Sequence, residues 1–217
     1  MAIKAKPPPT DKPKPRGKVK APSRPKADPS ATEASRLDAA IWIETALQAL
    51  AINGIDGVRV EVLCKQLKVT KGSFYWHFKD RDGLYDSMLD HWRRKTTLGL
   101  IERLDRGEVS PEARLRRLLQ IPVTGRRSPL AADVELAIRL WGRRDARAQR
   151  ALEEVDELRL RYISGLLKAC GVRESETDAR AILAYSYMRV AATLIPRDAA
   201  ELMTRCEDLL LGIGDRS

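Results

Sequence analysis

Hydrogen-bonding and aromatic side chains are concentrated in one short stretch of this 217-residue chain, residues 71–79, which reads KGSFYWHFK. Phe74 and Phe78 are four residues apart, so a helix would place them on one face as buried anchors. The opposite face carries groups that can donate hydrogen bonds or stack: Lys71, Ser73, Tyr75, Trp76 and His77. Such donors recognise the phosphates and base edges of DNA, and nucleic-acid recognition is the chemistry that this stretch favours.

Catalytic and metal-binding chemistry finds little support in the sequence. There are two histidines, His77 and His91, and the three cysteines, Cys64, Cys170 and Cys206, lie far apart. No cysteine or serine has a general base at a recognisable spacing, and there is no glycine-rich phosphate loop or metal-ligand cluster. We therefore expect no enzymatic activity, no metal and no cofactor, and we interpret the cysteines as reduced thiols.

A second helix and a turn precede this stretch and can present it. The first helix has an apolar stripe at helical spacing: Val60, Leu63, Cys64 and Leu67. Residues 68–70 interrupt the pattern, and the Thr70 hydroxyl is predicted to cap the next helix. Two short helices joined by a tight turn, with a polar second helix outside, fit the DNA major groove.

From about residue 37 to 92 the sequence resembles the DNA-binding domain of the tetracycline-repressor (TetR-type) family of bacterial regulators. The resemblance rests on VTKGSFYWHF at residues 69–78 and KDRDGL at residues 79–84. It continues to the C-terminus only as a general helical pattern. The resemblance implies a DNA-binding transcriptional regulator, namely a repressor that responds to a small molecule and binds a palindromic operator as a homodimer.

The implied fold is all-α, with about nine helices and no strand. A three-helix helix–turn–helix domain is expected at residues 36–80, and a helical regulatory and dimerisation domain at residues 81–217, with 81–106 as the helix that connects them. The helical pattern itself predicts further boundaries: 36–53, 111–122, 131–143, 145–170, 176–195 and 198–211.

The resemblance also implies which residues contact DNA. The start of the second helix points at base edges, positions further along contact phosphates, and Trp76 packs against the backbone or a thymine methyl. The predicted interface consists of Arg59, Thr70, Lys71, Gly72, Ser73, Tyr75, Trp76, His77 and Lys79. The alternative for each is an ordinary exposed residue.

Three residues depart from the family pattern. Arg59 stands where a Ser or Thr usually caps the first helix of the motif, and it offers a phosphate contact instead. Cys64 stands where Ala is usual. Lys68 replaces the usual turn glycine, so a residue with a side chain is expected to adopt a positive φ.

Most of the net charge of +10 lies outside the predicted DNA-binding domain. Residues 1–35 hold nine basic and three acidic residues and eight of the twelve prolines, and we interpret them as a disordered basic arm. Residues 36–95 hold ten basic and eight acidic residues. The arm adds phosphate contacts or reaches a minor groove, or it is only a solubilising extension. No lipidation motif or amphipathic stretch supports a third option, a polybasic membrane tether.

The C-terminal part gives weaker signals. In the resembled family the last two long helices form the dimer, and here these are residues 176–195 and 198–211. Small and apolar positions share one face of the first: Ala179, Leu183, Ser186 and Val190. Aromatic and sulfur-containing residues are candidates to line a ligand pocket, with plain core packing as the alternative: Trp92, Trp141, Tyr162, Tyr185 and Met188.

A charged run follows residue 146. Glu153 and Glu154 lie among four arginines, and we interpret them as i, i+4 ion pairs along one helix. The arginines are Arg147, Arg150, Arg159 and Arg161.

No apolar run is long enough to span a membrane and no signal peptide is evident, so a cytoplasmic protein is expected. The partners expected are an operator in double-stranded DNA, a second copy of the chain and an unidentified small-molecule effector. Two alternatives stay open. In the first, the regulator is an activator or acts without a ligand. In the second, the chain is a helical protein-interaction module without specific DNA binding.

Overall fold

The computed structural model describes residues 29–107, 110–124, 129–194 and 199–212. Within these ranges the chain is entirely helical, with no strand. The α-helices are α1 (Pro29–Asn53), α2 (Val60–Leu67), α3 (Lys71–His77), α4 (Arg81–Arg93), α5 (Gly99–Asp105), α6 (Pro111–Thr124), α7 (Pro129–Gly142), α8 (Ala146–Ala169), α9 (Glu174–Leu194) and α10 (Ala200–Leu211). A short 3-10 turn, η1 (Ile55–Gly57), follows α1, and a π-helical turn, η2 (Arg94–Leu98), joins α4 to α5.

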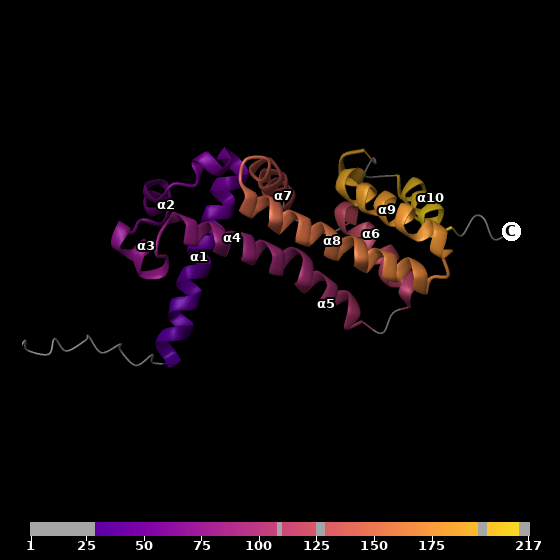
Figure 1. Cartoon of the computed structure of the whole chain (residues 1–217), viewed down its shortest axis with the longest axis horizontal. Helices are drawn as coiled ribbons and strands as arrows, with labels where there is room; N and C mark the ends of the chain where they lie inside the picture. The colour runs from indigo at the N-terminus through magenta and orange to yellow at the C-terminus, as the bar shows by residue number, and fades with distance from the viewer. Residues whose placement is uncertain (1–28, 108–109, 125–128, 195–198, 213–217) are drawn as a thin grey trace, which may run out of the picture.

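Counting α4, η2 and α5 as one continuous helix, the described residues form nine helices, which confirms the predicted fold class. Helices α1, α2 and α3 form one end of an elongated molecule, and α9 and α10 lie at the other (Figure 1). The α4–α5 helix and α8 run between these ends (Figure 1). No helix in the part of the chain described here is both long and apolar enough to cross a membrane.

Two apolar cores follow one another along the molecule. The first joins α1–α4 to α7 and the first half of α8, and its large fully buried members include Leu50, Leu63, Phe74 and Trp92. The second joins α5, α6, the end of α8, α9 and α10. Helix α8 contributes to both cores, so a movement of α8 affects the packing at each end.

Helix α1 begins earlier than predicted. Its first residue is Pro29, so residues 29–35, which we assigned to the arm, are helical. Proline is well tolerated at the first helical position, and residues 30–35 contain no further proline to break the helix. The rest of the predicted arm, residues 1–28, lies outside the described residues.

Most helix ends follow their sequence signals. Gly54 has a positive φ of 67° directly after α1. The Asp80 carboxylate accepts a hydrogen bond from the Gly83 N–H at 2.8 Å and caps α4. The Ser110 hydroxyl accepts one from the Ala113 N–H at 3.2 Å.

Candidate functional site

Buried aromatic residues fix α3 against the rest of the helix–turn–helix. Phe74 is fully buried and Phe78 is 6% exposed. The Trp42 ring of α1 meets the edge of Phe74, with 5.4 Å between ring centroids. Leu63 and Cys64 of α2 are buried in the same core, so α3 is held on one side only.

The other side of α3 faces outward. Trp76 is 80% exposed and Tyr75 is 60% exposed, which are large fractions for aromatic rings. Of the predicted interface, Arg59, Thr70, Lys71, Gly72 and Lys79 are also exposed, while Ser73 and His77 are half-buried. The structure therefore brings the predicted residues of α3 together on one accessible face.

The turn before α3 has the predicted strained geometry. Lys68 has φ 56° and ψ 40°, in the left-handed region that glycine usually occupies. Its N–H still donates to the Cys64 carbonyl and ends α2. Neither Arg59 nor Thr70 makes a side-chain capping hydrogen bond, so the predicted cap by the Thr70 hydroxyl is wrong. Thr70 is an exposed residue directly before α3.

An ion pair crosses the turn between α2 and α3. The Lys71 ammonium donates to the Glu61 carboxylate at 2.6 Å, and both side chains are mostly exposed. Glu61 raises the pKa of Lys71, and Lys71 lowers the pKa of Glu61. The motif-based prediction missed Glu61, because the pair joins residues ten positions apart on different helices.

Gly72 is not required by the packing of the free protein. A Cβ placed there would meet only the Thr70 hydroxyl oxygen, at 3.5 Å, which is an ordinary contact. Its φ is not in the left-handed region. The glycine thus leaves the outer surface of α3 without a side chain at this position, and the fold of the free protein does not require it.

A polar and aromatic cluster joins the helix–turn–helix to the rest of the molecule. The Tyr85 hydroxyl of α4 donates to the Val58 carbonyl at 3.5 Å, and its ring meets Trp141 of α7 at 5.1 Å between centroids. The Arg147 guanidinium of α8 lies 5.6 Å from the Tyr85 ring centroid and pairs with Asp82 at 3.0 Å. Helices α4, α7 and α8 are therefore tied together beside the helix–turn–helix.

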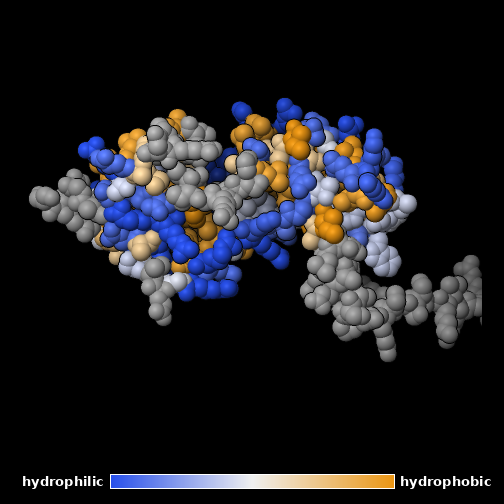
Figure 2. Space-filling model, turned by 180° about the vertical axis from the view of Figure 1, so that it is seen from behind, coloured by the Kyte–Doolittle hydropathy of each residue, from blue (hydrophilic) through white to orange (hydrophobic). Residues whose placement is uncertain are grey.

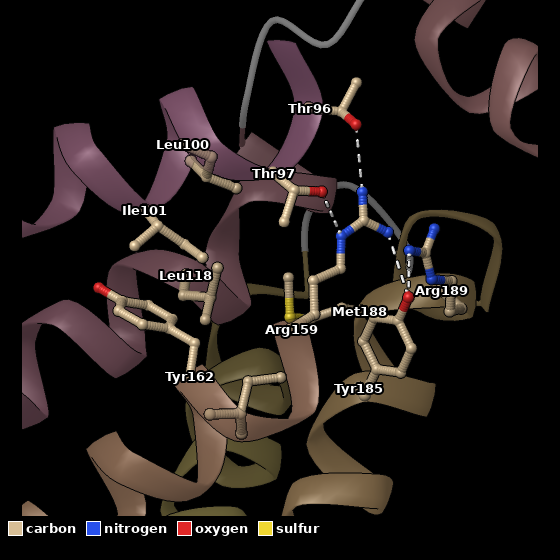
Figure 3. A pocket seen from close by; sticks show the side chains of 11 residues that line it. Thr96, Thr97, Leu100, Ile101, Leu118, Arg159, Tyr162, Tyr185, Met188 and Arg189 are labelled. Carbon is tan, nitrogen blue, oxygen red and sulfur yellow. Dashed lines mark hydrogen bonds between the residues drawn. The ribbon is translucent and has the colours of Figure 1, made fainter. Parts of the chain in front are cut away.

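Three of the five predicted pocket residues line one cavity. Tyr162, Tyr185 and Met188 lie around a cavity of about 30 Å³ between η2, α5, α8 and α9 (Figure 3). Trp92 lines an adjoining cavity of about 530 Å³, bounded mainly by α4, η2, α5, α6 and α7. Trp141 lines neither of these two; it packs against Tyr85 and lines a separate depression of about 660 Å³ between the end of α1, η1 and α7.

A buried charged cluster lies beside the smaller cavity and was missed in the sequence. Glu135 of α7 is 4% exposed and accepts from Arg159 of α8 at 2.9 Å, from Arg139 at 3.3 Å and also from Arg189 of α9. Asp156 pairs with Arg139 at 2.7 Å. Arg159 therefore pairs between helices, not along α8 as we expected. Glu154 likewise pairs with Arg93 of α4, at 2.5 Å, whereas Arg161 pairs along α8 with Glu157, at 3.8 Å.

The charges in this cluster hold one another ionised. Burial raises the pKa of Glu135, but the neighbouring guanidinium groups of Arg159 and Arg189 outweigh it, and the net pKa lies below its ordinary value. Burial lowers the pKa of Arg189. The acid is thus well satisfied, and Arg189 is the least stabilised cation of the group.

The cluster also contacts the connecting helix at its π-helical turn. The Arg159 guanidinium donates to the Thr97 hydroxyl at 3.0 Å and to the Thr96 hydroxyl at 3.3 Å (Figure 3). It also donates to the Tyr185 hydroxyl at 3.1 Å. Single π-turns within α-helices frequently mark functional positions. Arg159 thereby links the cavity wall to the helix that leads toward the helix–turn–helix.

Comparison with known proteins identifies the helix–turn–helix. Residues 43–88 match the model of the family described as bacterial regulatory proteins, tetR family. The uncharacterised HTH-type transcriptional regulator YuxN of Bacillus subtilis (strain 168) is 33% identical over 79 residues, which are 36% of this chain and 27% of YuxN. The match to this relative therefore covers about a quarter of its length.

Solved structures share the fold over most of the chain. A transcriptional regulator from Rhodococcus sp. Rha1 superposes with a TM-score of 0.61 at 20% identity, covering 81% of this chain and 94% of the other. A regulator from Saccharomonospora viridis, in complex with choline, gives a TM-score of 0.64 at 15% identity, covering 86% and 97%. At these identities the likeness establishes the fold.

Proposed function

We propose that the chain, whose residues 43–88 match the tetR family model, is a regulator of that family, and that it binds a palindromic DNA operator as a homodimer and represses transcription. The observation that carries the proposal is the outward face of α3. Two large aromatic rings and the Lys71 ammonium are exposed there, on a helix whose opposite side is anchored by Phe74 and Phe78. A short helix presented in this way fits a major groove.

Each predicted contact has a role in this proposal. Thr70, Lys71 and Ser73 reach base edges from the start of α3, where the low surface at Gly72 allows close approach. The residues that contact the phosphates and sugars are Arg59, Tyr75, Trp76, His77 and Lys79. Glu61 competes with DNA for Lys71, because their ion pair must open before the ammonium reaches a base or phosphate.

The proposed dimer uses the outer face of α9 together with α10. The four predicted positions of α9, Ala179, Leu183, Ser186 and Val190, are all exposed. Ile182 is 57% exposed, and Leu202 and Leu209 of α10 are 48% and 74% exposed. Hydrophobic residues also reach the otherwise mostly hydrophilic surface in separate places on the back of the molecule (Figure 2). Exposed apolar residues on two neighbouring helices support association with a second copy.

The proposed repressor releases DNA when a small molecule enters the cavities between η2, α5 and α9. The regulator from Saccharomonospora viridis, solved with choline, supports a small-molecule site within this fold. An effector that binds better to a DNA-incompetent arrangement shifts the population toward that arrangement. As a DNA-binding regulator of a bacterial family, the protein acts in the cytoplasm.

Electrophoretic mobility shifts with genomic fragments test the proposal. We expect one discrete, salt-sensitive complex with a fragment near the regulator's own gene, and two chains per operator in the complex. Affinity falls as salt rises, because phosphate contacts release counterions. Equal retardation of all fragments, or no retardation, would contradict the proposal.

A further inference from the structure

We propose that the effector is a monocarboxylate with an apolar body, whose carboxylate is bound by Arg189 in the cavity between η2 and α9. The inference deepens the proposed function by naming the chemical class of its effector. Five features carry it: surplus charge, unsatisfied donors, the size of the inner cavity, its apolar lining and the charges around the outer cavity.

The charged cluster has one positive charge more than it can balance. Glu135 and Asp156 face three guanidinium groups, those of Arg139, Arg159 and Arg189. Burying a cation without its counter-charge is costly, and burial accordingly lowers the pKa of Arg189. A ligand with a single negative charge would neutralise this surplus.

Two buried donors beside the cavities lack a partner. The Nε of Arg189, whose side chain lines the smaller cavity, makes no hydrogen bond. The indole N–H of Trp92 also makes none, although the residue is only 1% exposed and lines the larger cavity. Thr96 and Leu100 line both cavities, so the two adjoin. An unsatisfied buried donor favours a ligand that brings acceptors and does not bring donors.

The size and lining of the inner cavity match a carboxylate attached to an apolar chain. Its volume of about 30 Å³ holds roughly two water-sized groups, which corresponds to two carboxylate oxygens. The wall away from Arg189 is apolar and is formed by Leu100, Ile101, Leu118 and Met188 (Figure 3). The body of the ligand would extend past Leu100 into the larger cavity.

The larger cavity adds to the attraction for anions. Lys95, Arg103 and Arg117 line it, whereas Glu44 is its one acidic residue among those described. Glu44 already pairs with Lys95 and, at 2.9 Å, with His91. The two arginines thus leave a positive field at this cavity, which raises the local concentration of anions.

A ligand bound at Arg189 would affect the connecting helix through Tyr185 and Glu135, which both Arg189 and Arg159 contact. Tyr185 accepts from both Arg189, at 2.9 Å, and Arg159, at 3.1 Å. A carboxylate at Arg189 competes with Glu135 and Tyr185 for guanidinium hydrogen bonds. Arg159 is thereby freed to change its bonds to Thr96 and Thr97 of the π-helical turn, which lies in the helix leading to the DNA-binding end.

Isothermal titration calorimetry on the full chain, without DNA, tests the proposal with three probes of equal length: sodium octanoate, octan-1-ol and octylamine. We expect octanoate to bind at least about tenfold more tightly than either analogue, the gain typical of a charge-assisted hydrogen bond. If octanoate shows no such preference, including the case in which none of the three binds, the proposal is overturned. This comparison uses the native chain and needs no variant.

Arg189→Gln then locates the carboxylate. The variant should lose the octanoate preference and keep its affinity for octan-1-ol. The matched control is Arg161→Gln, on α8, whose side chain is 67% exposed and lines neither cavity, and it should keep the preference. An unchanged preference in a folded Arg189→Gln protein would overturn the assignment. Because no DNA is present, a failure of the proposed DNA binding leaves this result readable.

Discussion

At Gly72, the proposed recognition of DNA and the stability of the free protein favour different residues. Glycine in a helix costs about 1 kcal/mol relative to alanine, yet the free protein has room for a side chain at this position. Neither backbone conformation nor packing explains the residue. The proposed close approach of α3 to a duplex would explain it.

Gly72→Ala should therefore stabilise the free protein and weaken DNA binding. We expect the free energy of unfolding to rise by up to about 1 kcal/mol and the operator affinity to fall by about 1 kcal/mol or more. Urea unfolding and fluorescence anisotropy measure the two effects. Gly165→Ala, in α8, is the control, since a Cβ there meets nothing within 4 Å. It should stabilise the protein without changing DNA affinity. If Gly72→Ala also left DNA affinity unchanged, the proposed role of Gly72 in DNA binding would be contradicted.

Some properties of single residues in this site were predictable and others were not. The positive φ of Lys68 followed from a lysine at a turn position that demands glycine, because the requirement is local. The Thr70 cap was predicted from residue type alone, but the hydroxyl makes no capping hydrogen bond. The Lys71–Glu61 pair depends on how α2 and α3 cross, which the sequence pattern does not specify.

The two sides of helix α9 have different proposed roles: the inner side lines the cavity, and the outer side forms the dimer interface. Its inner side carries Tyr185, Met188 and Arg189 to the cavity, whereas Leu183 and Val190 lie exposed on the outer side. A ligand on the inner side thus acts on the helix that the proposed dimer uses. In the proposed dimer, this arrangement would couple effector binding to the distance between the two α3 helices.

Leu183→Glu tests the outer side. The side chain is 59% exposed in the single chain, so the change leaves the fold intact but buries a charge in the proposed interface. We expect the dimer dissociation constant to rise at least about tenfold by analytical ultracentrifugation. Leu136→Glu, equally 59% exposed but on α7, should leave it unchanged. A dimer unaffected by Leu183→Glu would exclude this face as the interface.

The Glu135 cluster predicts a specific pH dependence of stability. The folded-state pKa of Glu135 is lowered, so its contribution is present above its ordinary value near 4.5 and is lost as the pH falls through the folded value. Glu135→Gln should cost about 3 kcal/mol at pH 7, because it leaves buried guanidinium groups without a partner. Urea unfolding at pH 7 and pH 4 should show a smaller pH effect in the variant than in the native chain. Glu157→Gln, with a side chain 68% exposed, should retain the native pH effect.

Helix boundaries were predictable because their signals are local, as with Asp80 at α4 and Gly54 after α1. The partners of Arg159 were not, because an arginine in a helix has acids within reach both along its own helix and on its neighbours. The exposed stripe of α9 was recognised from its spacing. The cavity wall was not predictable, because it depends on how α8 and α9 cross. This crossing brings Arg159 and Arg189 to the same tyrosine, Tyr185.

Across the whole molecule, the two ends share continuous packing. The first core runs from Phe74 of α3 to Val155 of α8, and Tyr85 joins α4 to α7 and α8 through Trp141 and Arg147. Trp141 lies at this junction and also lines the depression beside α7. Such contacts allow a change at the π-helical turn to alter the position of α3, as regulation by an effector requires.

The most direct test of the central claim is the affinity of variants for operator DNA, by fluorescence anisotropy with the fragment upstream of the regulator's own gene. Lys71→Ala and Tyr75→Ala should each weaken binding at least about tenfold, since each removes a contact to a base or phosphate. Lys168→Ala is the matched control, because Lys168 is an exposed lysine paired with Glu174 at the far end of α8, and it should bind as the native chain does. Unchanged affinity in both α3 variants would contradict the assignment of α3 as the DNA-reading helix.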